Sequence, residues 1–457
     1  MRLKRIKLFD AKHLPIIVVL CIIDLIFICF FSLSGIISFL YTSFCFGFLN
    51  CFCEREKRTT NCIYFLVYIL LALIYMTFNY IQMPEYMGLS GPSDVGTDDV
   101  NYYAGLADAP ITYSTERWDI AEENTYSKLI RFLYPFKIIH PVDIIIFNIL
   151  GIAFLPYLTN NISYVFFEDK RVSSISEKLV FYCPFLWSIG LIIMRDVIST
   201  SLIMVAYYCF LRKKYVSFIL FAAVLAYLKL GFVVFLIVPI IIYYISEFVY
   251  SWRRFFNSQA DRTRVLKVIV LSFFVVFALV FYIIPNLDSI TQGRLDGGSF
   301  FRTTFIDYLN DANDDSFLVK IYDLPIFIRL PALIVTFIVI PPLTMNFYID
   351  GVFELRIFLQ NVVAPVFWCF VFYYLFQFFL TYKFLASKGK VLFWIIILLA
   401  LALGMVSLQT RHKAVLIPYL YMAIAYSMKY NKGKANIMSG IVIFLFVIIQ
   451  FAFGFLR

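Results

Sequence analysis

Long apolar runs separated by short polar breaks occupy most of the chain. The first run, residues 15–53, is too long for one crossing, because a membrane-spanning helix needs about 20 residues. Ser32, Ser34 and Gly35 interrupt this run with small and polar side chains, which favour a turn. The pattern therefore predicts two helices joined in a tight hairpin, and an all-α polytopic integral membrane protein as the fold class.

Further apolar runs predict a total of about 12 to 14 transmembrane helices. Several runs are shorter than a full crossing, which fits tilted helices or a locally thinner bilayer. The runs that follow the hairpin are residues 63–81, 142–158, 179–194, 197–211, 216–228, 232–250, 268–284, 358–381, 391–408, 414–428 and 437–455.

The segment 326–349 is apolar but contains Arg329, Pro331 and the pair Pro341 and Pro342, and a proline inside a helix kinks it. Short cytoplasmic loops of membrane proteins carry most of the Lys and Arg residues. The basic loops of this chain all lie on one side only if segment 326–349 enters and leaves the membrane from the same side. We therefore predict a re-entrant hairpin at 326–349.

This arrangement places the amino terminus in the cytoplasm and the two long loops, residues 82–141 and 285–325, on the periplasmic side. The basic residues that precede the first apolar run resemble a signal peptide, but no cleavage site follows, so we expect a retained first span. No internal repeat or separate soluble region is evident, so residues 1–457 are predicted to form a single transmembrane domain.

Composition supports the membrane assignment and excludes other classes. A chain with 62% hydrophobic and only 15% charged residues cannot hide its apolar side chains in one water-soluble core. The net charge of +10 could indicate nucleic acid, but membrane proteins collect Lys and Arg on their cytoplasmic side, so no nucleic acid partner is expected. Cys51, Cys53 and Cys62 lack a fourth ligand, and the chain has only three histidines, so neither a metal nor a cofactor is predicted.

The first long loop contains two adjacent carboxylates, Asp98 and Asp99, followed by Tyr102 and Tyr103. Carboxylates beside tyrosines just outside a membrane can act as a general base or bind sugar hydroxyls. The alternative is a solvated turn, because Asp and Gly favour turns in any protein.

Charged side chains also interrupt the apolar runs on the same predicted side. Each costs about 2.5–3.5 kcal/mol at membrane depth, so such residues mark functional sites by default. The alternative is a long side chain that reaches the interface at a tight turn. The residues are Arg195 with Asp196, Lys229, and Arg411 with His412 and Lys413, while Arg302 and Arg329 flank the second long loop.

Clustered Arg and Lys side chains at the mouth of a membrane cavity suit a phosphate or diphosphate, since guanidinium forms bidentate, charge-assisted hydrogen bonds with such oxygens. We therefore expect a lipid-linked diphosphate as ligand. No glycine-rich phosphate loop, serine nucleophile motif or zinc protease motif is present in the sequence.

The order of these features resembles the Wzy-type O-antigen and capsule repeat-unit polymerases, and more distantly other GT-C-like membrane glycosyltransferases. The resemblance covers nearly the whole chain and is one of layout. It departs at position 229, where Lys stands in place of the expected Arg and lacks the planar fork of a guanidinium. The resembling features are Asp98 to Tyr103, Met194-Arg195-Asp196, Tyr227-Leu-Lys229, the proline-broken run Leu324 to Pro331, and Arg411 to Pro418.

The resemblance implies a metal-independent glycosyltransferase with a GT-C-like fold in the bacterial inner membrane. It would transfer a growing glycan from undecaprenyl diphosphate to another undecaprenyl-linked repeat unit at the periplasmic face, with membrane lipid and a chain-length regulator as further partners. Alternatives are another lipid-linked-sugar glycosyltransferase, an O-antigen ligase, or a lipid-linked oligosaccharide flippase.

The resemblance and the residue chemistry together give each candidate residue a role. We expect Asp98, Asp99 or His412 to act on the acceptor hydroxyl. The residues expected to bind the substrate are Arg195, Asp196, Lys229, Arg302, Arg329, Arg411, Tyr102 and Tyr103.

The predicted orientation can be tested by thiol labelling in a background without reactive native cysteines. A cysteine introduced at residues 94–99 should react with an impermeant reagent added from outside, and one near Lys388 should not. The reverse pattern would contradict the orientation. Reaction at both places would contradict only the re-entrant assignment of 326–349.

Overall fold

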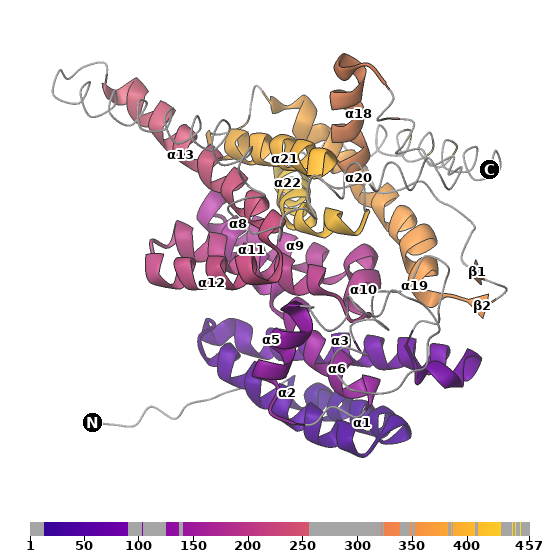
Figure 1. The fold of residues 1–457 in the computed structure, drawn as a ribbon. Helices are drawn as coiled ribbons and strands as arrows, with labels where there is room; N and C mark the ends of the chain where they lie inside the picture. Colours follow the sequence, from indigo (N-terminus) through magenta and orange to yellow (C-terminus); the bar gives the residue numbers. More distant parts are fainter. Residues whose placement is uncertain are drawn as a thin grey trace, which may run out of the picture.

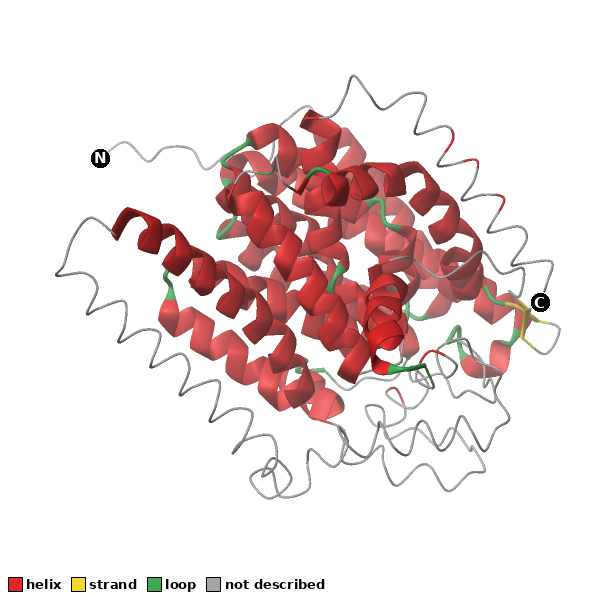
Figure 2. Cartoon of the chain, turned by 90° about the horizontal axis from the view of Figure 1, so that it is seen from above, coloured by secondary structure: helices red, strands yellow, loops and turns green. Residues whose placement is uncertain are grey.

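The computed structural model describes residues 13–89, 103, 125–136, 140–255, 321, 324–338, 348–349, 352–382, 385, 387–406, 410–430, 441, 444 and 448. The regular structure of these residues is helical, apart from one antiparallel pair of two-residue strands, β1 (Tyr348–Ile349) and β2 (Val352–Phe353). Figures 1 and 2 show the helices packed into one body, with the strand pair at its edge.

The first apolar run folds as the predicted hairpin, because α1 (Leu14–Phe31) ends at Ser32 and α2 (Ser34–Cys51) starts two residues later. Gly35 is required at this turn. A Cβ atom there would lie 2.6 Å from Ile28 and 3.2 Å from Val142, so only glycine lets α2 pack so closely on both neighbours. The hairpin and α3 (Arg55–Gln82) lie together at the bottom of Figure 1.

The rest of the described chain forms shorter helices joined by tight turns. Short 3-10 turns lie at η2 (Pro84–Tyr86), η4 (Leu230–Phe232) and η8 (Thr410–Val415), and a π-helical turn, η6 (Leu359–Val363), joins two helices. The remaining helices are α5 (Thr125–Leu133), α6 (Pro141–Asn148), α7 (Leu150–Ala153), α8 (Leu155–Phe167), α9 (Lys170–Phe181), α10 (Pro184–Gly190), α11 (Arg195–Leu211), α12 (Tyr215–Leu228), α13 (Val233–Phe255), α18 (Ile326–Ile338), α19 (Leu355–Phe358), α20 (Ala364–Leu380), α21 (Ser387–Val406) and α22 (Ile417–Tyr430).

Six helices within the described residues are long and apolar enough to cross a membrane. A seventh span is possible if α10 and α11, which are bent by 119° relative to each other, count as one. The predicted total of about 12 to 14 spans stays a prediction. The six are Leu14–Phe31, Ser34–Cys51, Arg55–Gln82, Pro141–Phe167, Leu355–Leu380 and Ser387–Gly404.

The run predicted at residues 179–194 differs from the structure. Instead of one helix, the chain forms the end of α9 and the separate helix α10, with Tyr182 and Cys183 between them. Pro184 starts α10, where its missing N–H costs nothing. The chain then turns sharply again before Arg195, so this part of the molecule has two bends close together.

Ion pairs join helix ends that are far apart in sequence. At one end of the molecule, here called the Glu168 end, Lys388 donates to Glu168 over 2.6 Å, and Lys429 pairs with Asp169. Helices α21 and α22 run between this end and η8, which contacts Asp196. We call that opposite end the Asp196 end.

A buried ion pair fastens α3 to α9 and gives a stability prediction. Glu177 is buried, accepts a hydrogen bond from Asn160 over 2.7 Å and pairs with Lys57. Lys57→Met should lower the free energy of unfolding by about 3 kcal/mol. This value is at the low end of the range for breaking a buried ion pair, because Lys57 is partly exposed. Adding Glu177→Gln should restore most of the loss, as measured by thermal unfolding in detergent.

The exposed residue Lys178, on the same helix as Glu177, supplies the control. Lys178→Met should leave the unfolding temperature unchanged. Equal losses in the Lys57 and Lys178 variants would show that the buried pair does not fasten the two helices.

Candidate functional site

The sharp bend between α10 and α11 places Asp196 at the start of a helix. Met194 precedes α11 in an extended conformation, and no side chain caps the helix. The bend is held from outside, because the Asn148 side chain donates to the Ile192 carbonyl over 2.9 Å. An acidic residue in the first turn is favoured by the helix dipole, which is positive at that end.

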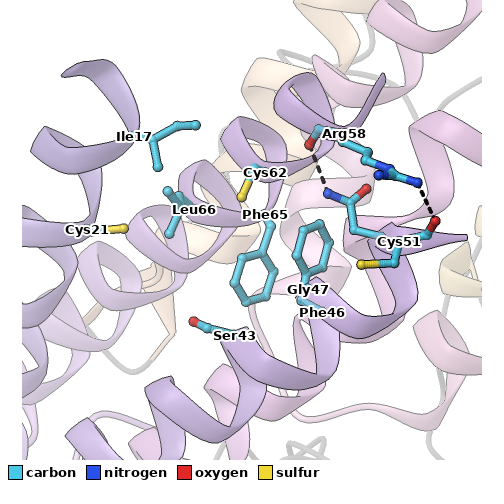
Figure 3. Close-up of a pocket in the computed structure, with 11 residues that line it drawn as sticks. Ile17, Cys21, Ser43, Phe46, Gly47, Cys51, Arg58, Cys62, Phe65 and Leu66 are labelled. Carbon is cyan, nitrogen blue, oxygen red and sulfur yellow. Dashed lines mark hydrogen bonds between the residues drawn. The ribbon is translucent and has the colours of Figure 1, made fainter. Parts of the chain in front are cut away.

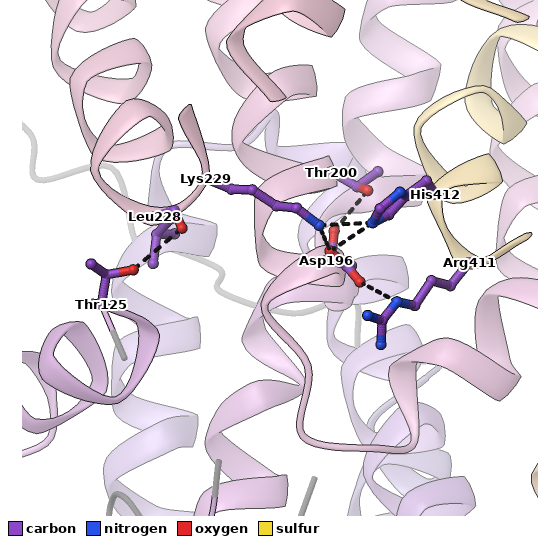
Figure 4. Close-up of polar contacts among 7 residues, drawn as sticks. All are labelled: Thr125, Asp196, Thr200, Leu228, Lys229, Arg411 and His412. Carbon is purple, nitrogen blue, oxygen red and sulfur yellow. Dashed lines mark hydrogen bonds and ion pairs between the residues drawn. The ribbon is translucent and has the colours of Figure 1, made fainter. Parts of the chain in front are cut away.

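Three side chains from distant segments converge on the Asp196 carboxylate (Figure 4). Lys229, directly after α12, donates to Oδ1 over 2.6 Å. Arg411, from η8, places Nε 3.1 Å from Oδ2. His412 Nε2 lies 3.6 Å from Oδ1 and 2.7 Å from Lys229 Nζ. We call Asp196, Lys229, Arg411 and His412 the Asp196 cluster.

An aromatic ring covers one side of the cluster. The Phe232 ring centroid lies 4.0 Å from Lys229 Nζ and 5.0 Å from the His412 ring, which it meets edge to face. Such contacts stabilise a cation that has lost part of its hydration. The cluster is therefore closed on this side, while the Lys229 and Arg411 side chains keep 17% and 24% exposure.

Burial and neighbouring charges set the protonation of the cluster. Burial and the Lys229 ammonium lower the pKa of His412 to about 4, so its imidazole is neutral at pH 7. Burial also lowers the pKa of Lys229 to about 8, against the attraction of Asp196. At neutral pH the Lys229 ammonium donates to both Asp196 and the neutral His412 ring.

Arg195 gives this region a positive excess. It begins α11, is half-buried and lies close enough to Lys229 to repel it. Its side chain makes no hydrogen bond and no ion pair with another described residue. One carboxylate therefore faces three cations, namely Lys229, Arg411 and Arg195. This arrangement, at the positive end of a helix, can bind an anion such as a phosphate.

The structure brings together five of the residues predicted from sequence, namely the four members of the Asp196 cluster and Arg195. Arg329 is engaged elsewhere, because its Nε donates to the Leu324 carbonyl over 3.0 Å at the start of α18. Tyr103 is buried near Asp143. Burial, and to a smaller extent the charge of Asp143, raises the pKa of Tyr103 to about 12. Asp98, Asp99, Tyr102 and Arg302 lie outside the described residues.

Several residues near the cluster were missed by the sequence reasoning. Thr125, at the start of α5, donates to the Leu228 carbonyl over 3.3 Å, next to Lys229. Tyr126 donates to Asn148 over 2.6 Å, and so links α5 to the bend before α11. No sequence signal marks these residues, because Thr, Tyr and Asn are common at helix ends.

Lys413, although noticed in the sequence, was not expected to fasten another helix. It is buried and donates to the Thr336 carbonyl over 2.7 Å, which joins η8 to α18. Among the described residues, no group of three or more His, Cys, Asp or Glu side chains is placed to hold a metal ion.

The pKa of His412 predicts how stability depends on pH. In the unfolded chain His412 becomes protonated near pH 6.5, whereas in the folded protein it stays neutral down to about pH 4. Stability should therefore fall as pH falls through this window, by up to about 3 kcal/mol. His412→Gln should reduce the fall in unfolding temperature between pH 7.5 and pH 4.5.

His13→Gln, a change at an exposed imidazole, is the control and should keep the wild-type pH dependence. Identical pH profiles for wild type and His412→Gln would show that His412 takes up its proton equally in the folded and unfolded states.

Comparison of the chain with protein-family models, with curated proteins and with solved structures finds no match. Any functional conclusion therefore depends on the chemistry of the Asp196 cluster and its surroundings.

Proposed function

We propose that the protein polymerises undecaprenyl-diphosphate-linked oligosaccharide repeat units into O-antigen or capsular polysaccharide at the periplasmic face of a bacterial inner membrane. The observation that carries the proposal is the excess of cations around Asp196, at one end of a bundle of apolar helices. A diphosphate attached to a membrane lipid matches this site in charge and in its position at helix ends.

The proposed reaction needs cations and a base, and no metal. The bond from the anomeric carbon to the diphosphate oxygen breaks, and the diphosphate leaves with the electron pair. The acceptor hydroxyl oxygen forms the new bond to that carbon and gives its proton to a base. Arg195, Lys229 and Arg411 would stabilise the charge that develops on the departing diphosphate.

His412 is the base that we assign within the described residues. Its imidazole is neutral at pH 7, and its Nε2 lies 2.7 Å from Lys229 Nζ. When Lys229 turns to a bound diphosphate, Nε2 becomes available to take a proton. Asp98 and Asp99, which lie outside the described residues, are the alternative bases.

Asp196 has a positioning role in this proposal. Both of its carboxylate oxygens contact protein cations, Oδ1 with Lys229 and Oδ2 with Arg411. Cations brought together without an anion would repel one another, and the buried carboxylate reduces that cost. Asp196 therefore holds Lys229 and Arg411 close enough to act on one diphosphate.

The proposal includes the finer topology, with about 12 to 14 spans, a GT-C-like fold, and loops 82–141 and 285–325 on the periplasmic side. The pairs at the Glu168 end support it, because Lys388 and Lys429 lie together there, as the positive-inside rule requires. Lys413 donates to the Thr336 carbonyl, so the last turns of α18 lie near η8. The proposal keeps the re-entrant hairpin at 326–349, because only that arrangement puts every basic loop on one side.

The position of the cations also supports an enzyme over a flippase. A transporter places its binding residues near the middle of its spans, often at broken helices around a central cavity. Here Arg195 begins a helix, Lys229 follows one, and Arg411 lies in a 3-10 turn between two others. A site at helix ends suits a reaction at the membrane surface.

Replacing the cations should abolish polymer formation while the protein remains inserted and abundant. Arg195→Ala or Arg411→Ala removes a charge-assisted contact to a desolvated anion, which costs about 2–4 kcal/mol, or about 10²–10³-fold in rate. The host should then carry core lipid with a single repeat unit, seen by gel electrophoresis of its lipopolysaccharide. Arg→Lys should rescue only partly, because the planar fork is lost.

Arg212→Ala is the matched control. Arg212 follows the other end of α11 and is exposed, and among the described residues its side chain contacts only the Tyr208 ring. It should leave polymer length unchanged. Polymer of normal length from abundant Arg195→Ala and Arg411→Ala proteins would contradict the assignment and leave the loop around Asp98 and Asp99 as the remaining candidate.

A further inference from the structure

A cavity of about 240 Å³ lies between α1, α2 and α3, in a part of the molecule that the proposed reaction does not use (Figure 3). Most of its wall is apolar. A dry apolar cavity of about 150 Å³ already holds a benzene-sized molecule, so this one is large enough for a segment of hydrocarbon chain. The apolar lining comes from Ile17, Cys21, Phe46, Cys62, Phe65 and Leu66.

One end of the cavity is polar and carries a fixed cation. Arg58 donates from Nη2 to the Cys51 carbonyl over 2.6 Å and from Nε to the Cys53 carbonyl over 3.2 Å. The Asn50 side chain donates to the Arg58 carbonyl over 2.9 Å. These bonds hold the guanidinium at the mouth of the cavity, and the exposed Arg55 lies one helical turn before it.

The three helices that form the cavity are surrounded by apolar surface. Each is long and apolar enough to cross a membrane. Ile26 of α1 and Phe44 of α2 turn outward and are 65% and 72% exposed. In a bilayer, lipid chains would pack against this apolar surface beside the cavity.

The Arg58 end of the cavity is directed away from the Asp196 cluster. Lys57 meets Glu177 and Tyr68 donates to the Phe181 carbonyl, so α3 runs in the same direction as α9. Because α9 starts beside Asp169, the start of α3 and Arg58 are directed toward the Glu168 end. A ligand with its head at Arg58 is therefore on the opposite side from the proposed donor and acceptor.

We propose that this cavity binds one acyl chain of an anionic phospholipid, with the phosphate at Arg58 and Arg55. The apolar wall matches the chain, and the guanidinium matches a phosphate oxygen by charge-assisted hydrogen bonding. This site is independent of the proposed glycan transfer, because it uses other residues at the other side of the membrane.

The test uses the full-length protein in phosphatidylcholine nanodiscs that contain phosphatidylglycerol with a photoreactive group in its acyl chain. After illumination, labelled peptides should map to α1, α2 and α3. Gly47→Leu should reduce this labelling at least fivefold, because Gly47 lines the cavity and a Cβ atom there meets no other atom within 4 Å. A larger side chain can therefore start at this position without meeting a neighbour at its β-carbon.

Leu49→Phe is the matched control, because Leu49 is an exposed residue of the same helix that does not line the cavity. It should keep wild-type labelling. Arg58→Gln should keep the photolabelling by the acyl chain. In this variant, unlabelled phosphatidylglycerol should reduce the labelling no more than phosphatidylcholine does. In the unmodified protein, phosphatidylglycerol should slow maleimide labelling of Cys62, which lines the cavity.

Three results would overturn the proposal. One is equal labelling of α1–α3 in wild type and Gly47→Leu. Another is equal competition by phosphatidylcholine and phosphatidylglycerol in the wild-type protein. The third is stronger labelling of these helices by a photoreactive polyprenyl diphosphate than by phosphatidylglycerol. None of these measurements reads polymer synthesis, so failure here and failure of the proposed function are separate outcomes.

Discussion

A buried carboxylate constrains the structure around the functional site. Asp196 is 2% exposed, and an ionised carboxylate in such a place is tolerated only with cations beside it. Its partners come from the end of α12 and from the turn between α21 and α22, so one charge joins three separate parts of the chain. Such a buried pair adds little net stability compared with apolar packing. Its presence is better explained by a need to hold cations at this place.

The sequence singled out the members of the Asp196 cluster and Arg195, but not how they contact one another. Charges within apolar runs are costly, so Arg195, Lys229 and Arg411 stand out from their surroundings. Their convergence on Asp196 has no sequence signal, because Lys229 is 33 residues from Asp196 and 183 residues from His412. The neutral state of His412 likewise depends on burial between segments that only the folded chain brings together.

The fold was predictable where a turn has a local cause. Small and polar residues at positions 32–35 mark the first hairpin, and the structure breaks the helix there. Hydropathy gave one run at 179–194, but the chain breaks after Phe181 because Pro184 starts a new helix. The hydropathy pattern also did not predict the buried polar contacts between α8 and α9. Asn160 and Lys57 both contact Glu177 Oε2, and such partners cannot be inferred from the pattern of either helix alone.

The two ends of the molecule balance charge differently. At the Glu168 end, two adjacent acids each pair with one cation, Glu168 with Lys388 and Asp169 with Lys429. At the Asp196 end, one carboxylate faces Lys229, Arg411 and the neighbouring Arg195. An excess of positive charge in a partly buried place is unfavourable unless an anion joins it, and the attraction is stronger there than in water. The cations around Asp196 therefore attract an anion more strongly than an exposed pair such as Lys388 with Glu168 does.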